Sequence, residues 1–313
     1  MSVYSKIEVS APGSTMLMGE HAVLFGEPAL ACAVAARLTV TLLPRADRQV
    51  LIDSALGQYS GSLDTLAPMP ELAFVLAVIE RYRASLSRGF QLTIQSGFSH
   101  TVGLGSSAAV TAATTAAMAA YSGQSTAPEV LFETALAAVH QVQNGRGSGT
   151  DLAASIYGGV IGYDMAPAGV RPLPGLPPIV LYYSGYKMKT PDVLALVERK
   201  AERHPELYTG LYHLMGQTCR QAEQAVRDQD WSALGELMNI YQGLMDALGV
   251  CDATLAQMIH RLRAEPGVQG AKISGSGLGD CVLALGVVES DMPWDVIPVS
   301  VAATGVEIHY ETN

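Results

Sequence analysis

Three glycine-rich segments, far apart in the sequence, carry residue types that can hold phosphate groups. The first is HTVGLGSSAAV, residues 100–110. Gly103 and Gly105 allow a tight turn and the close approach of a ligand, and Ser106 or Ser107 is expected to cap the alanine-rich helix that follows. The N–H groups at the start of such a helix favour a bound phosphate. The lysine of a Walker A loop is missing, so a different kind of phosphate loop is predicted.

The other two segments bring further polar groups next to regular structure. GSGTDLAASIYGG, residues 147–159, places Asp151 just after a Gly-Ser-Gly turn and at an expected helix start. Taken alone, an aspartate in this position is more often a simple helix cap. KISGSGLGDCVLAL, residues 272–285, places a glycine-rich loop between two expected strands. We expect the three loops to converge on one polyanionic ligand.

Composition excludes several classes of partner. The chain has 313 residues, of which 49% are hydrophobic and 15% charged, and its formal net charge is −10. Without a Lys/Arg-rich run, neither a nucleic acid nor an anionic membrane is an expected partner. The first 13 residues do not resemble a signal peptide, and the four cysteines lack the spacing of a disulfide framework or zinc site. We therefore expect reduced core thiols and a cytoplasmic protein.

The elements around these loops predict two domains. The proline- and glycine-rich stretch 166–178 is the strongest candidate boundary, which gives an N-terminal domain at 1–170 and a C-terminal domain at 171–313. Each half reads as strands, helices and further strands, so two α+β domains are expected. The expected helices are 70–86, 106–121, 128–143, 191–203, 207–227, 231–248 and 252–264, and the expected strands are 35–43, 90–94, 179–183, 270–273, 281–288 and 306–310.

Four segments, in the same order along the chain, resemble motifs of the GHMP kinase family. SAPGSTMLMGEHAVLFGEPALACAV, residues 10–34, is similar to the first family motif, and residues 100–110 are similar to the second, the phosphate-binding loop. GSGTD resembles the segment with the catalytic aspartate, and KISGSGLGDC resembles the third motif. The resemblance implies a domain like ribosomal protein S5 domain 2, followed by a ferredoxin-like domain, with ATP in the cleft between them.

The resemblance also implies roles for individual residues. Asp151 would face the acceptor hydroxyl, and Ser107 would reach Mg²⁺. The residues that would surround the ATP phosphates are Gly103, Leu104, Gly105, Ser106, Ser107 and Ala108, with Gly275, Ser276 and Gly277 supporting the cleft from the other domain. Glu20 and His21 would lie at the acceptor pocket, although a histidine there is, by itself, more often a satisfied polar residue near the core.

Three departures from the family pattern stand out, of which Ser99 and Thr101, in place of the proline and first glycine before the second motif, are expected to matter least. The family commonly has lysine after APG, where this chain has Ser14, and it has a Mg²⁺-binding glutamate where this chain has His140. Loss of the lysine charge could cost several kcal/mol of transition-state stabilisation. We expect Lys187 or Lys189 to supply the missing cation, beside Thr190 in the loop expected to bind the acceptor. A solvated surface lysine is the alternative for each of them.

The acceptor remains open between related alcohols. GEHAV in the first motif favours mevalonate, so that 5-phosphomevalonate would be the product. His140 with GSGTD, together with the GDC of the third motif, favours phosphomevalonate, for which Arg146 offers a further cation. A catalytically inactive metabolite-binding regulator is the other hypothesis, and a homodimer is left open. Residues 44–70 are expected to help form the pocket for the nucleotide base.

Overall fold

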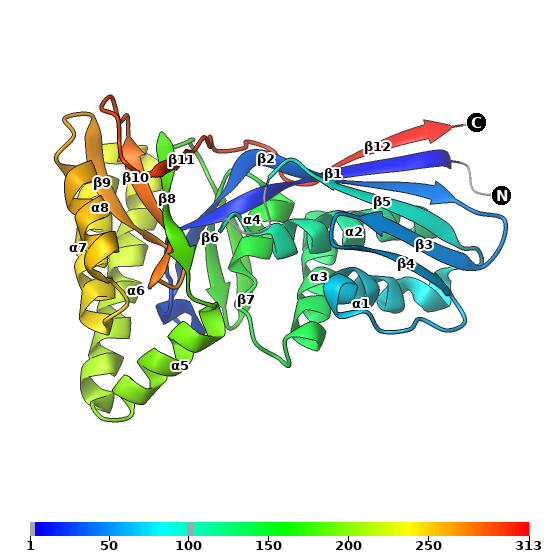
Figure 1. Ribbon diagram of the computed structural model, residues 1–313, viewed down its shortest axis with the longest axis horizontal. Coiled ribbons are helices and arrows are strands. Elements are labelled where there is room, and N and C mark those ends of the chain that lie inside the picture. Colours follow the sequence, from blue (N-terminus) through cyan, green and yellow to red (C-terminus); the bar gives the residue numbers. More distant parts are fainter. Residues whose placement is uncertain (1–3, 99–102, 313) are drawn as a thin grey trace.

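Two β-sheets lie one after the other along the long axis of the molecule, and each has helices packed against it (Figure 1). The computed structural model describes residues 4–98 and 103–312. The first sheet has eight strands and the second has four. This arrangement confirms the two-domain α+β architecture expected from the sequence.

The eight-stranded sheet is built on a long antiparallel pair, β1 (Tyr4–Met18) and β2 (Ala29–Pro44). Alternate side chains of β1, those of Ile7, Val9 and Ala11, point into the core, as the period of a half-buried strand requires. The remaining strands are β12 (Glu307–Thr312) beside β1, then β5 (Phe90–Ser96), β3 (Gln49–Ser54) and β4 (Gly57–Ser62) beyond β2, and β6 (Val160–Met165) with β7 (Ala168–Leu173) beside the first residues of β2.

Four helices cover one face of this sheet (Figure 1). They are α1 (Ala73–Tyr82), α2 (Ser106–Ser122), α3 (Pro128–Val142) and α4 (Thr150–Tyr157). The central helix α2 contacts α1, α3 and α4 as well as β1 and β2. Most of its buried side chains are alanine, and such small side chains let a helix approach several neighbours closely. The amino end of α2 is therefore held firmly beside β1.

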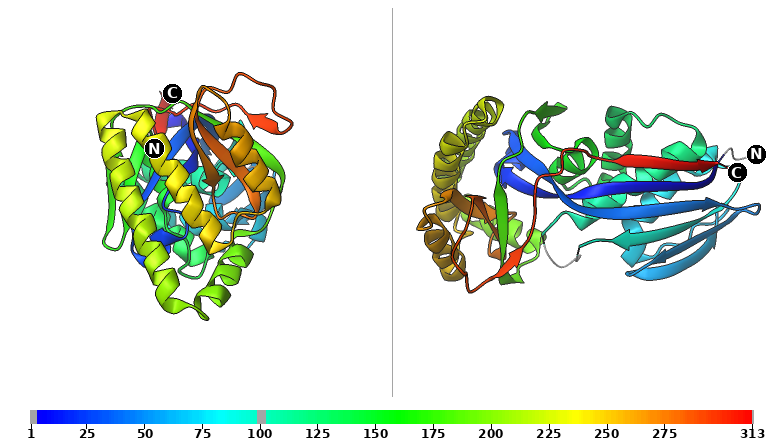
Figure 2. Two further views of the ribbon diagram at one scale, coloured as in Figure 1. Left: turned by 90° about the vertical axis from the view of Figure 1, so that its left-hand side faces the viewer. Right: turned by 90° about the horizontal axis from the view of Figure 1, so that it is seen from above.

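The four-stranded sheet has the order β11 (Asp295–Ile297), β8 (Ile179–Lys187), β10 (Gly279–Gly286) and β9 (Val268–Ser274). Its helices are α5 (Thr190–Ala201), α6 (Pro205–Asp228), α7 (Trp231–Leu248) and α8 (Ala253–Arg263). Helices α6, α7 and α8 form one end of the molecule (Figure 2). The connection between β9 and β10 lies within the third glycine-rich segment, and His21 of the first domain contacts it at Ser276.

Two hydrophobic cores meet where β1 and β2 pass from one sheet toward the other. The outer parts of both strands belong to the first core, whereas Leu17, Met18 and Leu30 pack with the second. Strand β7 still pairs in the first sheet and β8 in the second, so the expected division at 170/171 falls inside β7. The chain end also returns as β12 to the first sheet. The strand that carries Ser14 thus reaches the junction of the two cores.

Most expected helices are confirmed to within a few residues. The expected helix at 70–86 is shorter, because α1 is flanked by short 3₁₀ turns at Pro70–Leu72 and Arg83–Ser85. The hairpins β3–β4 and β6–β7 were not expected from the sequence. All four cysteines are unpaired, as expected. Across the described ranges, every helix is too short or too polar to cross a bilayer.

Candidate active site

The phosphate loop enters α2 through a glycine in the left-handed conformation. Gly105 has φ 63° and is the residue before the first helical turn. The expectation that Ser106 or Ser107 caps the helix is wrong, because both serines already lie inside it and no side chain among the described residues caps this end. The N–H groups of a first helical turn have no partner within the helix. Such groups can donate hydrogen bonds to a bound phosphate.

The loop packs directly against β1 and β10. Ser14 N donates a hydrogen bond of 3.0 Å to the carbonyl oxygen of Leu104, whose side chain is buried. A Cβ atom at Gly105 would collide with Ser14 Oγ, and one at Gly103 would collide with the Asp280 carboxylate. Close packing against these side chains therefore favours glycine at both positions. The path of the loop is fixed by its neighbours.

Asp151 lies opposite this loop, at the start of α4. Gly149, with φ 83°, precedes the helix, and Asp151 is its second residue. Ser14 Oγ donates a hydrogen bond of 2.9 Å to Asp151 Oδ1, so the carboxylate is directed at β1 and does not cap its own helix. Burial raises the pKa of Asp151, while the Ser14 hydrogen bond and the charge of Lys187 act in the opposite direction. Ser14, which stands where the family commonly has lysine, is thus in contact with the carboxylate expected to be catalytic.

Lys187 and Lys189 have different surroundings. Lys187 Nζ lies 2.6 Å from Asp280 Oδ2, and Asp280 Oδ1 accepts a hydrogen bond of 3.0 Å from Gly103 N. This places the Lys187 cation at the phosphate loop. Lys189 is exposed at the start of α5, and within 4–98 and 103–312 its Nζ has no hydrogen-bond or ion-pair partner. Thr190 is likewise exposed, and it is the first residue of α5 and not part of the preceding loop.

Glu20 and His21 are buried against the second domain. Glu20 Oε1 lies 2.5 Å from Lys272 Nζ, and His21 Nε2 lies 2.8 Å from the carbonyl oxygen of Ser276. A carbonyl only accepts, so Nε2 carries the proton, and burial lowers the pKa of His21 and favours the neutral ring. The contacts of this pair are with the third glycine-rich loop.

The third loop supplies site residues that the sequence reasoning did not single out. Leu278 and Asp280 both adopt positive φ angles, 55° and 66°, which are uncommon for residues other than glycine. Asp280 is 8% exposed and touches both Gly103 and Lys187. An acidic residue interrupting a glycine-rich run was the available signal. Its partners lie far away in the sequence and could not be inferred.

A resident magnesium ion would find few protein ligands here. His140 Nε2 donates a 3.1 Å hydrogen bond to the carbonyl oxygen of Gly147, so its ring is already engaged. Among the described residues there is no group of three or more His, Cys, Asp or Glu side chains arranged to hold a metal ion. The exposed hydroxyl of Ser107, in the first turn of α2, fits one position of a shell otherwise made of phosphate oxygens and water.

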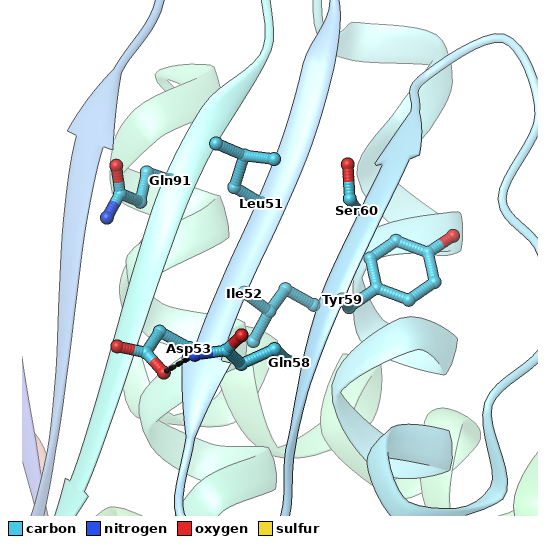
Figure 3. A pocket seen from close by; sticks show the side chains of 7 residues that line it. All are labelled: Leu51, Ile52, Asp53, Gln58, Tyr59, Ser60 and Gln91. Carbon is cyan, nitrogen blue, oxygen red and sulfur yellow. Dashed lines mark hydrogen bonds between the residues drawn. The ribbon is translucent and has the colours of Figure 1, made fainter.

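A separate hollow of about 360 Å³ lies on the face of the first sheet away from the helices (Figure 3). Gln58 Nε2 donates a hydrogen bond of 3.4 Å to Asp53 Oδ1 across it. The residues that line it are Leu51, Ile52, Asp53, Gln58, Tyr59, Ser60 and Gln91. All but Gln91 fall within 44–70, the region expected to help form the base pocket. That role stays a prediction.

Two domains, each a β-sheet covered by helices, with a glycine-rich loop at their junction, are the architecture of a kinase of the GHMP class. Residues 73–159 match the model of the GHMP kinases N-terminal domain, and residues 222–291 match that of the GHMP kinases C-terminal domain. The chain belongs to the GHMP kinase family.

Among curated proteins, it is similar to mevalonate kinases of archaea. It is 33% identical to that of Aeropyrum pernix, over 88% of this chain and 87% of the relative. It is 31% identical to that of Pyrococcus furiosus, over 90% and 89%. Among solved structures, L. major mevalonate kinase in complex with R-mevalonate superposes with a TM-score of 0.81 and 21% identity, covering 97% of this chain and 99% of that one. The fold is that of the two-domain GHMP kinases.

Proposed function

We propose that this protein is an ATP-dependent kinase that converts mevalonate to 5-phosphomevalonate. The observation that carries the proposal is the Asp151 carboxylate, held by Ser14 beside the open amino end of α2. Similarity over most of the chain to mevalonate kinases supports mevalonate as the acceptor. The unpaired cysteines are consistent with a reducing compartment, so we place the reaction in the cytoplasm.

Phosphoryl transfer depends mainly on positioning and on stabilising charge that spreads over the transferred oxygens. In our account the N–H groups that begin α2, together with Gly103–Ala108, bind the nucleotide phosphates. Gly275–Gly277 support the same cleft from the second domain. Mg²⁺, when bound through Ser107 and the phosphates, would neutralise part of the developing charge.

Asp151 acts on the acceptor in this account. The acceptor oxygen forms a bond to the γ-phosphorus, the bond from that phosphorus to the leaving ADP oxygen breaks, and the hydroxyl proton passes to Asp151. Its raised pKa makes the carboxylate a better proton acceptor than an ordinary aspartate. The hydrogen bond from Ser14 fixes which oxygen remains free to face the hydroxyl.

Lys187 supplies the cation that the family normally places at position 14. Its ammonium group is already beside the phosphate loop through Asp280, whereas Lys189 points to no described partner. On nucleotide binding, Lys187 can share its charge between Asp280 and the γ-phosphate. Lys189 and Thr190 border the expected acceptor loop and remain candidates for contact with the carboxylate or hydroxyl groups of the acceptor.

The direct test is an ADP-release assay of the purified protein with ATP and mevalonate, phosphomevalonate or diphosphomevalonate. We expect release with mevalonate, and one phosphomonoester formed per ADP by phosphorus NMR. Release with phosphomevalonate alone would favour the second candidate, which the third-motif Asp280 and the nearby Lys187 also support. ATP binding without release for any acceptor would contradict the kinase proposal and favour an inactive binding protein.

A further inference from the structure

Lys272 in β9 is fully buried, although lysine is rarely found without exposure. Its Nζ donates a 2.5 Å hydrogen bond to Glu20 Oε1 and another to the carbonyl oxygen of Ile273, and it lies 5.5 Å from the centre of the Tyr241 ring. The Glu20 side chain is 3% exposed. Removing one partner of such a buried pair leaves an uncompensated charge, so the two residues depend on one another.

Glu20 and its neighbours hold the start of the third glycine-rich loop. Gly275 N donates to Glu20 Oε1 at 3.4 Å, and His21 binds the carbonyl oxygen of Ser276. Just before the loop, the hydroxyls of Thr15 and Ser274 lie 2.8 Å apart and share a hydrogen bond. Strand β1 and the residues after it therefore contact three consecutive positions, 274–276, of the other domain.

The Glu20 main chain is fixed from a third element. Tyr241, on α7, is fully buried, and its hydroxyl donates to the carbonyl oxygen of Glu20 at 2.9 Å. The same hydroxyl accepts from Gly19 N at 3.0 Å. The ring of Tyr241 also faces Lys272. The Glu20–Lys272 ion pair is therefore held in place by contacts with β1, α7 and β9.

The far end of the loop reaches the phosphate loop. Gly277 packs so closely that a Cβ there would lie 2.5 Å from the carbonyl oxygen of Val250. Three residues later, Asp280 accepts the hydrogen bond from Gly103 and pairs with Lys187. Because the loop is short and tightly packed, we expect a displacement at Gly275 to shift Asp280 as well.

We propose that Lys272 and Glu20 are positioning residues for phosphoryl transfer, whose ion pair sets the place of loop 275–280 and thereby of Asp280 at the phosphate loop. The proposal rests on the kinase function proposed above. It assigns Glu20 to the nucleotide side of the site, and not to the acceptor contact expected from the sequence.

The test compares Glu20→Gln, Lys272→Met and the double variant with the wild-type protein. Each single change removes one charge with little change of volume, and the double change leaves a neutral pair. We expect the KM for ATP and the Kd for ADP to rise about tenfold or more in each single variant, with the KM for mevalonate within about twofold. The double variant should lose less thermal stability than the sum of the losses in the two single variants, because neither charge is then buried without its partner.

Arg220→Met is the matched control. Arg220, on α6, pairs with Glu27 at 2.8 Å, and Glu27 lies two residues before β2, so this pair also joins the first domain to a helix of the second. The Arg220 side chain is half-exposed, and neither residue belongs to a glycine loop. We expect it to change nucleotide affinity by less than twofold.

Two results would overturn the inference. One is a folded Glu20→Gln variant with unchanged ADP affinity and a raised KM for mevalonate, which would make Glu20 an acceptor contact. The other is unchanged affinity for both ligands in folded Glu20→Gln. Glu20→Gln keeps the shape of the side chain, so it tests the inference even if Lys272→Met does not fold. ADP binding, measured by calorimetry, needs no acceptor and stays informative even if the wild-type protein phosphorylates none.

Discussion

Ser14 occupies the position where the family commonly has lysine, and its hydroxyl ends 2.9 Å from Asp151 Oδ1. Compared with the family pattern, a positive charge is missing from the site, and a neutral hydroxyl donates instead to the carboxylate proposed to be catalytic. A donor to the ionised form favours that form, so Ser14 holds the pKa of Asp151 below the value that burial alone would give. We therefore expect Ser14 to influence the pH dependence of turnover.

Ser14→Ala is expected to raise the pKa of Asp151, because the carboxylate loses its hydrogen-bond donor while its burial is unchanged. The deprotonated form needed for proton transfer then appears only at higher pH. We expect the acidic limb of the kcat profile to move up by about 0.5–1 pH unit. Ser5→Ala, on the same strand but far from the site, controls for loss of a hydroxyl. An unmoved or downward-shifted limb would contradict this role.

Replacing Lys187 and Lys189 separately distinguishes the two cations. Lys187→Met should lower kcat by about 100-fold, because it removes the charge beside the phosphate loop. Lys189→Met, two residues after the end of β8 and without a described partner for its ammonium group, should change kcat by less than about threefold. Steady-state assays of both variants at saturating ATP provide the comparison. Equal losses, or a larger loss for Lys189, would show that the compensating cation was assigned to the wrong residue.

At the level of elements, α2 has a glycine in the left-handed conformation at each end. Gly105 has φ 63° and a Cβ there would strike Ser14, whereas Gly123 has φ 70° and open space around it. The two glycines share a left-handed conformation that would strain any other residue, and they differ in what surrounds them. This makes them a matched pair for separating helix geometry from loop packing.

Gly105→Ala and Gly123→Ala should each lower the free energy of unfolding, by about 1 kcal/mol at Gly123 and by more at Gly105, since an alanine in this conformation is strained. Only Gly105→Ala should also weaken ADP binding, by about tenfold or more, because the collision displaces the phosphate loop. Urea unfolding and calorimetric titration measure the two effects. If Gly123→Ala weakened ADP binding equally, the loop packing would not be the cause.

Sequence patterns were sufficient where contacts are local. The helix at 106–121, the turn before Asp151 and the amphipathic helix at 231–248 follow from residues within a few positions of one another. The β3–β4 hairpin is polar on its open face, and its glycines weakened the strand pattern. Local sequence patterns alone therefore did not predict the short β3–β4 and β6–β7 hairpins.

Much of the candidate site depends on contacts that no local pattern reports. Gly103 and Asp280 are 177 residues apart, and Glu20 and Lys272 are 252 apart. Composition and spacing predicted that the glycine loops and Asp151 converge on one ligand, which stays a prediction. They did not reveal that the Glu20–His21 segment faces the third loop, because that depends on how two domains pack.

For the whole molecule, the junction of two cores determines where the site lies. Strand β1 runs from the first core to the second, with Ser14 between them, and β12 covers its outer edge in an antiparallel pairing from Tyr4 to Ser10. An uncovered edge strand loses ladder hydrogen bonds and is prone to association with other chains. The returning chain end is thus part of what holds β1 in place.

Removal of residues 307–313 should lower the thermal unfolding midpoint by several degrees, because β1 loses one of its two neighbours and the Arg37–Glu307 ion pair is removed. Turnover at low temperature should remain within about threefold, since β12 carries no candidate site residue. Differential scanning calorimetry and the ADP-release assay measure the two effects. An unchanged midpoint would mean that β12 adds nothing to the first sheet.

The central claim is that the loop from Gly103 holds the nucleotide while the carboxylate at position 151 acts on the alcohol. Asp151→Asn separates the two, because it keeps the shape of the side chain and removes its basicity. We expect ADP affinity within about threefold of wild type and a loss of kcat with mevalonate of about 100-fold or more. A variant that binds ADP normally and still phosphorylates mevalonate at the wild-type rate would contradict the account.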